Sequence, residues 1–139
     1  RSRVTRNVQR TQAMHHSRLA GFIIDCNTQD LEKAAEFWSA ALGWPLKPKS
    51  EEPSLKYRQL MTGPDGLHVE VQKVDHESRV HLDIETDDID AEVARLERLG
   101  AKAIGRVHTW CVMEAPTGQR FCVVRPQKSG VDAPANARE

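Results

Sequence analysis

The chain has 139 residues, with 20 lysines and arginines balanced by 20 aspartates and glutamates, 39% hydrophobic residues and 29% charged residues. This composition is typical of one compact soluble domain whose core needs neither disulfides nor a structural metal. A formal net charge of zero argues against a dedicated nucleic-acid or anionic-membrane protein, because both kinds of binding need a basic surface. We therefore expect no nucleic-acid partner and no membrane association.

The longest apolar runs, such as residues 22–24, are far shorter than the ~20 residues of a membrane helix, and no hydrophobic signal segment opens the sequence. The three cysteines, Cys26, Cys111 and Cys122, form neither a CxxC pair nor a dense disulfide framework. An odd number of cysteines suits a reducing compartment. These features predict a cytoplasmic protein.

The two ends differ in composition from the middle. Residues 1–18 carry five arginines and no acidic residue, which predicts a flexible basic arm, either natural or preceding a native start at Met14. Residues 128–139 are rich in small and polar residues and predict a disordered tail. The folded domain is expected at residues 19–127.

The first half of this domain predicts a strand, a helix and three further strands. A strand at residues 21–26 precedes a helix that Gly43 ends, with the apolar positions Leu31, Ala34, Ala35, Trp38 and Leu42. Prolines mark an irregular link in which Leu46 can begin a short strand. Two longer strands are expected at residues 57–61 and 67–74, on either side of a turn at residues 63–66.

The second half repeats this order. A strand at residues 80–85 leads to a helix that is capped near Asp88 and ends at Gly100, with the apolar positions Ile89, Val93, Leu96 and Leu99. Further strands are expected at residues 103–104, 108–113 and 119–125, with a turn at 115–118. The turn motifs MTGPDG and MEAPTG begin 52 residues apart, and the two Leu-Gly helix ends lie 57 apart. These landmarks predict two modules, residues 19–76 and 79–127.

Two β-α-β-β-β modules with Leu-Gly helix ends and Pro-x-Gly turns resemble the vicinal oxygen chelate superfamily. This superfamily includes glyoxalase-like, bleomycin-resistance-like and dioxygenase-like proteins. Residues 80–101 and 115–124 look like its small bacterial glyoxalase-like branch. The resemblance implies an α+β fold in which two tandem modules form a curved, partly open mixed β-sheet around a concave pocket, with the helices on the convex face. Function stays open, because the superfamily includes isomerases, dioxygenases, epimerases and antibiotic-sequestering proteins.

Alternation along the strands predicts which side chains face this pocket. The apolar residues assigned to the helix side are Leu67, Val69, Val71, Leu82, Ile84, Phe121 and Val123. The residues assigned to the other face are Gly21, Ile23, Asp25, His68, Glu70, Gln72, His81, Asp83, Glu85, Arg120, Cys122 and Val124. Such a face can simply be solvated. The resemblance favours a ligand pocket, because ligands bind on the concave face in that superfamily.

The face on which Trp110 lies depends on the geometry of the last turn. A three-residue loop at 116–118, with Gly118 left-handed, would place Val112 opposite Cys122 and Trp110 on the pocket face. A four-residue loop would place Cys111 there instead. The glycine favours the first arrangement, which would make Trp110 an aromatic wall for a planar ligand.

Superfamily members that bind a divalent metal place His in the first strand and Glu in the last strand of each module. Glu70 and His81 match this pattern, whereas Gly21 and Cys122 occupy the other two positions. The resemblance therefore implies an incomplete set of metal ligands, Glu70 and His81, and we expect no cofactor. If a metal binds, zinc is the most plausible, because imidazole and thiolate suit it.

The sequence thus predicts a protein that binds or transforms a small organic molecule without a complete metal site. Glu70 and His81 are the candidate catalytic residues, and the candidate substrate-binding residues are His68, Gln72, Asp83, Trp110, Arg120 and Cys122. The alternatives are a metal-dependent lyase, isomerase or dioxygenase, and a drug-sequestering binding protein without catalysis. A homodimer is also expected, because symmetric pairing would cover the exposed edges of two small modules.

Overall fold

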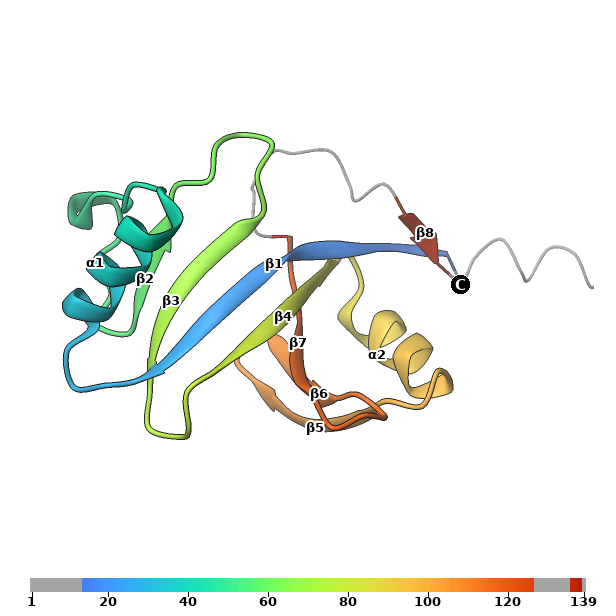
Figure 1. The fold of residues 1–139 in the computed structure, drawn as a ribbon. Helices are drawn as coiled ribbons and strands as arrows, with labels where there is room; N and C mark the ends of the chain where they lie inside the picture. The colour runs from blue at the N-terminus through green and yellow to red at the C-terminus, as the bar shows by residue number, and fades with distance from the viewer. Residues whose placement is uncertain (1–13, 127–135, 139) are drawn as a thin grey trace, which may run out of the picture. The chain divides into compact units, whose positions relative to one another are not determined.

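The computed structural model describes residues 14–126 and 136–138 (Figure 1). Most of the predicted arm and tail lie outside these residues. The chain divides into two compact units. Residues 20–83 form one of them, which we call the central unit. The described residues before 20 and after 83 form the other, the terminal unit. Among the described residues, no helix has both the length and the apolar character needed to cross a membrane.

The central unit contains β1 (His15–Asn27) from residue 20 onward, α1 (Leu31–Leu42), a 3-10 turn (Lys49–Glu51), β2 (Tyr57–Leu60), β3 (His68–Val74) and β4 (Arg79–Thr86) up to residue 83. The strand order is β2-β3-β1-β4. β1 runs parallel to β3, and β2 runs antiparallel to β3, so the sheet of this unit is mixed. Leu46 forms an isolated bridge with Leu60, where the sequence analysis placed the start of a short strand.

Local signals in the sequence explain why α1 forms where it does. The side chain of Asp30 accepts a hydrogen bond from the Lys33 backbone N–H and caps the first turn. Gly43 ends the helix with a φ of 76°, a left-handed conformation that glycine adopts without strain. The helix packs over β2 and β3 and buries a core of Ile24, Leu31, Ala35, Leu60, Val69 and Val71.

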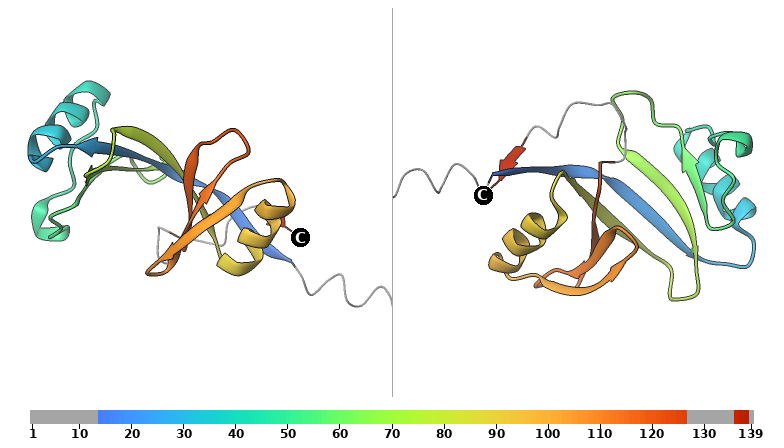
Figure 2. Two further views of the ribbon diagram at one scale, coloured as in Figure 1. Left: turned by 90° about the horizontal axis from the view of Figure 1, so that it is seen from below. Right: turned by 180° about the vertical axis from the view of Figure 1, so that it is seen from behind.

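The terminal unit contains the end of β4, α2 (Ile89–Arg98), β5 (Lys102–Val107), β6 (Trp110–Glu114), β7 (Arg120–Val124) and β8 (Asn136–Arg138). Figure 2 shows α2 beside β5, β6 and β7. The strands run in the order β7-β6-β5 and pair antiparallel. Their core under α2 consists of Val93, Leu96, Cys111, Met113 and Val123. The fold is therefore α+β with two β-α-β-β-β modules, as the sequence predicts.

Several features differ from the sequence-based expectation, including the strand β8 within the predicted tail. β1 begins at His15, within the residues assigned to the arm, and its first residues pair with β8. The Oγ1 of Thr86 donates to the His16 carbonyl at 2.7 Å, which attaches this segment to the start of α2. The placements of Leu67 and Leu82 under a helix are wrong, because these side chains are 42% and 51% exposed. Alternation still turns Leu82 away from His81, but α1 covers β2 and β3, at the opposite end of the strand order from β4.

Candidate functional site

Five of the predicted site residues lie on one face of the central unit. Pairing of Gln72 with Asp25 and with Tyr57 places these three side chains on the same side of the sheet. We call this side the polar face. Its polar side chains are Asp25 from β1, Tyr57 and Gln59 from β2, His68, Glu70 and Gln72 from β3, and His81 and Asp83 from β4. The opposite side of β3 carries the buried valines beneath α1.

His68 and Glu70 form the first hydrogen-bonded pair on the polar face. The Nε2 atom of His68 lies 2.8 Å from Oε1 of Glu70, and their side chains are 10% and 19% exposed. A carboxylate can only accept a hydrogen bond, so the tautomer with hydrogen on Nε2 fits this contact. Nδ1 then accepts from the Gln59 amide at 3.5 Å. Beside this pair, the Gln72 amide donates to the Tyr57 hydroxyl at 3.3 Å.

His81 lies between two aspartates. Its Nδ1 atom is 2.7 Å from Oδ2 of Asp25, and its Nε2 atom is 3.4 Å from Oδ1 of Asp83. The second distance is short enough for an ion pair, but the contact lacks hydrogen-bond geometry, and Oδ1 of Asp83 is left without a hydrogen-bond partner. Oδ1 of Asp25 is also buried without a partner. The Asp25 side chain is only 2% exposed, so its carboxylate lies behind the imidazole that it holds.

Asp25 is the site residue that the sequence analysis did not select. Alternation places it on the polar face, but its partner His81 is 56 residues away in the sequence. A single strand aspartate carries no signal for such a distant contact. Only the placement of β1 beside β4 reveals it.

The other three predicted site residues lie in the terminal unit. Val112 pairs with Cys122, and Gly118 has a φ of 94°, which confirms the three-residue loop. Cys111 is consequently buried against α2, where burial raises the pKa of its thiol, and Trp110 takes the opposite face of β6. The guanidinium of Arg120 donates to Glu114 at 3.4 Å. All three residues belong to the terminal unit.

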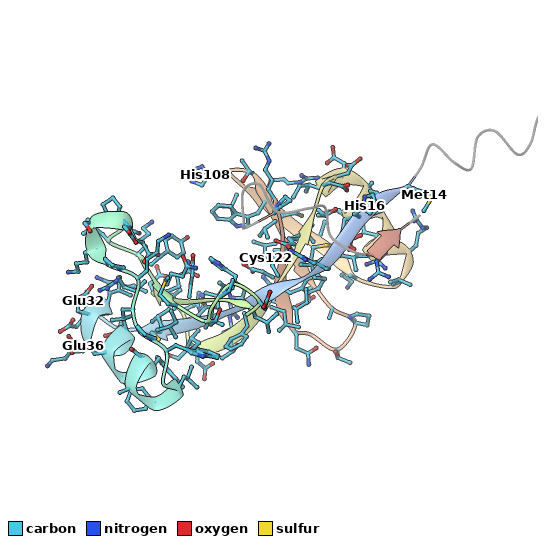
Figure 3. The ribbon with its side chains drawn as sticks, turned by 90° about the horizontal axis from the view of Figure 1, so that it is seen from above. Met14, His16, Glu32, Glu36, His108 and Cys122 are labelled. Atoms are coloured by element: carbon cyan, nitrogen blue, oxygen red, sulfur yellow. The ribbon has the colours of Figure 1, made fainter. Side chains whose placement is uncertain are left out.

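The terminal unit also contains an open depression of about 660 Å³ beside the start of α2. Its lining includes Arg106, His108 and Arg125, but none of the residues predicted from sequence. His108 lies at the turn between β5 and β6, with its ring centroid 5.5 Å from that of Trp110, and Figure 3 shows its position together with that of Cys122. Two carboxylates of its lining, Asp87 and Asp90, are bonded to His16 and Arg106, but no residue predicted from sequence lies there, so we do not take the depression as the candidate site.

Glu70 and His81, the two metal ligands that the resemblance implies, belong to separate bonded pairs on the polar face. Glu70 is engaged by His68, and His81 is engaged by Asp25. Within the described residues, Glu70 belongs to no group of three ligand-type side chains with converging atoms. At the position of the missing first-strand histidine, a Cβ on Gly21 would lie 1.7 Å from the His68 carbonyl oxygen.

Comparisons with known proteins agree with the fold. A family model described as a glyoxalase-like domain matches residues 21–124. The chain is similar to the hypothetical protein BH1468 from Bacillus halodurans C-125, with 12% identity and a TM-score of 0.57 over 84% of this chain and 99% of that one. It is also similar to a methylmalonyl-CoA epimerase in complex with methylmalonyl-CoA and NH4+, with 18% identity and a TM-score of 0.51 over 86% and 99%. At these identities the likeness concerns the fold alone. No curated protein matches the sequence.

Proposed function

Because this chain belongs to the glyoxalase-like domain family, within the vicinal oxygen chelate superfamily, we propose that it binds a small organic molecule at the polar face and transfers a proton on it. One observation carries the proposal. Both imidazoles of this face are bonded to carboxylates, at 2.8 Å for His68 and 2.7 Å for His81, while their side chains are only 10% and 14% exposed. A merely solvated face would leave such groups in water.

The bonding pattern assigns a role to each group. Glu70 uses Oε1 to hold His68, which leaves Oε2 to accept a proton from a bound molecule. Asp25 accepts from Nδ1 of His81 and thereby fixes the ring. Nε2, which lies 3.4 Å from Oδ1 of Asp83, is the nitrogen to which we assign proton exchange with the ligand. Glu70 is the proposed base. His81 is the proposed acid in its doubly protonated form, because with Nδ1–H donating to Asp25 only that form carries a proton on Nε2. Gln72 and Tyr57 supply neutral hydrogen-bonding groups beside them.

A second candidate is a binding protein without catalysis. The Gln72 amide and the Tyr57 hydroxyl, bonded at 3.3 Å, are neutral groups that can hold a ligand without moving a proton. The same polar face would then bind its ligand without transferring a proton.

The test begins with ligand capture. Purified protein is incubated with a metabolite extract from a bacterial culture, desalted and denatured, and the released molecules are identified by mass spectrometry. We expect a small molecule that Glu70→Gln and His81→Asn retain far less than the wild type, whereas Asp65→Asn, an exposed turn residue, retains it fully. Equal retention by all variants would contradict the polar face as the site.

The captured molecule is then incubated with protein in D2O. Incorporation of deuterium that depends on Glu70 supports proton transfer. Retention of the molecule without deuterium exchange would reject the enzyme and support the binding protein.

A further inference from the structure

We infer that the ligand of the polar face is a cation with N–H donors, such as a protonated amine or a guanidinium. This inference rests on the proposed function and specifies its ligand class. It starts from the charges on the polar face, where the three carboxylates Asp25, Glu70 and Asp83 have only imidazoles within ion-pair distance. In the described part of the chain, no lysine or arginine lies within that distance of any of the three.

The nearest arginine along β4 does not change this balance. Alternation places Arg79 on the same side of the strand as His81, but its side chain is exposed. Its guanidinium contacts Nε2 of His76 at 3.4 Å, in the turn between β3 and β4. With its three carboxylates ionised and its imidazoles neutral, the polar face of the central unit therefore has an excess of negative charge even when Arg79 is counted.

The cluster of Asp25, His81 and Asp83 shows this excess most clearly. One imidazole carries at most one positive charge, so two ionised carboxylates around it leave a net negative charge. Oδ1 of Asp25 and Oδ1 of Asp83 are both buried and accept no hydrogen bond from the protein. Buried acceptors are normally satisfied, and a negative charge with little solvent around it attracts a cation more strongly than an exposed one does.

The exposure of the three side chains indicates how a ligand would reach the cluster. The Asp83 and His81 side chains are 10% and 14% exposed, whereas Asp25 is 2% exposed. Asp83 and the edge of the His81 ring can therefore contact a ligand. Asp25 does not contact the ligand, and it acts through its charge and through its hydrogen bond to His81. A donor is needed at Asp83, which favours an amine or guanidinium over a quaternary ammonium ion.

The test uses four small probes that differ in charge: benzylamine, benzamidine, benzyl alcohol and benzoate. Each is titrated into 15N-labelled protein, and backbone and imidazole resonances are followed by NMR. We expect the two cations to shift the signals of residues 25, 81 and 83, with binding weakened by added NaCl, because charge attraction is screened. Benzoate is expected to leave these signals unchanged.

Two variants and a matched control locate the charge. Asp83→Asn is expected to weaken benzylamine binding about tenfold, since it removes the carboxylate that contacts the ligand. Asp25→Asn is expected to weaken it as well and to shift the His81 imidazole signals without ligand. Asp65→Asn removes the same charge from an exposed turn and should leave binding unchanged. Circular dichroism establishes that each variant is folded, and Asp83→Asn provides the test if the buried Asp25→Asn variant does not fold.

The outcomes separate this inference from the proposed function. If benzyl alcohol or benzoate shifts the polar-face signals and the cations do not, the charge assignment is wrong while the polar face remains the site. If no probe shifts them, the inference fails, and the capture experiment decides separately whether the polar face is the site. If equimolar Zn2+ displaces benzylamine and itself shifts the His81 signals, the cluster is a metal site and the inference is overturned.

Discussion

Val69 and Glu70 are neighbours in the sequence whose side chains lie on opposite faces of β3, so they separate folding from ligand binding. Val69 is fully buried beneath α1, and Val69→Ala is expected to lower the free energy of unfolding by about 1–3 kcal/mol without changing ligand binding. Glu70→Gln keeps the side-chain shape and removes the charge. It should alter ligand affinity or turnover and change stability little. Urea unfolding and titration of the captured ligand measure the two effects.

The outcome that contradicts this contrast is equal loss of stability in both variants with no effect on any ligand, because the polar row would then be structural. The corresponding pair on β4 cannot serve, since Leu82 is about half exposed and contributes little to the core. The sequence identifies the face of each β3 residue because the strand alternates cleanly. It does not reveal whether a helix covers that face, which depends on where α1 packs.

Metal content is the second property decided by single residues. Gly21 has no ligating side chain, and Glu70 and His81 are held by separate partners. We expect the purified protein to carry much less than one equivalent of divalent metal by elemental analysis. Any retained metal should be zinc rather than magnesium or calcium, which prefer six or more oxygen ligands. Stoichiometric metal that is lost in Glu70→Gln or His81→Ala would contradict this prediction and support a metal-dependent enzyme.

At the scale of the elements, the close approach of β1 and β3 depends on Gly21. Gly21 pairs with His68, and a Cβ at this position would meet the His68 backbone, which cannot move aside as a flexible side chain can. Gly21→Ala is therefore expected to lower the free energy of unfolding by about 1–3 kcal/mol. Thermal and urea unfolding measure the change.

Gly105 in β5 provides the matched control for this substitution. A Cβ there would have nothing within 4 Å. Gly105→Ala should therefore leave stability nearly unchanged. If the two alanine variants were equally stable, β1 and β3 would not approach each other as closely as the structure indicates.

The attachment of the start of β1 to α2 depends on Glu92. This fully buried carboxylate accepts hydrogen bonds from Arg95, at 2.7 and 2.8 Å, and lies 2.7 Å from Nε2 of His15. Burial alone would raise the pKa of Glu92, but the hydrogen bonds from Arg95 and His15 outweigh it and lower the pKa below its ordinary value of 4.5. Because this pKa is depressed in the folded state, the stabilisation is complete above pH 4.5 and is lost as the pH falls through the folded pKa.

Glu92→Gln is therefore expected to cost about 3 kcal/mol near neutral pH, since it leaves Arg95 without its buried partner. Below pH 4.5, the free energy of unfolding should fall less steeply in this variant than in the wild type. Urea unfolding at a series of pH values measures both effects. Glu97→Gln, on the exposed side of the same helix, should match the wild type. If the free energy of unfolding depended on pH identically in all three proteins, Glu92 would not stabilise the attachment of β1 to α2.

Helix caps, turn glycines and alternating strands are local signals, and they predicted the two modules from sequence. The strand at His15 was missed because residues 15–18 have no apolar period, and the partner that buries His15 is Glu92, 77 residues later. The candidate site follows the same division. His68 and Glu70 are two positions apart on one strand and could be paired from the sequence, whereas Asp25 and His81 required the order of the strands.

For the whole molecule, we predict a homodimer. Several apolar side chains remain exposed in each unit, among them Val80 and Leu82 in β4, at 57% and 51%, and Ile104 and Val107 in β5. Every residue of β5 is exposed, and this strand lies at the end of the strand order, where its outer edge has no neighbour within the described residues. Apolar edges of this kind are commonly covered by a symmetric second copy, because pairing removes the apolar surface from water and closes the edge.

Sedimentation velocity at micromolar concentrations measures this assembly directly, and the expected result is one species with twice the chain mass. Leu82→Lys places a charge among the exposed apolar side chains of β4 and should shift the equilibrium toward the monomer, because burying an unpaired charge is costly. Leu55→Lys is the matched control, since Leu55 is 92% exposed in the irregular link before β2 and should leave the dimer intact. A wild-type protein that sediments as a monomer would show that these apolar side chains are stable in water without a second copy.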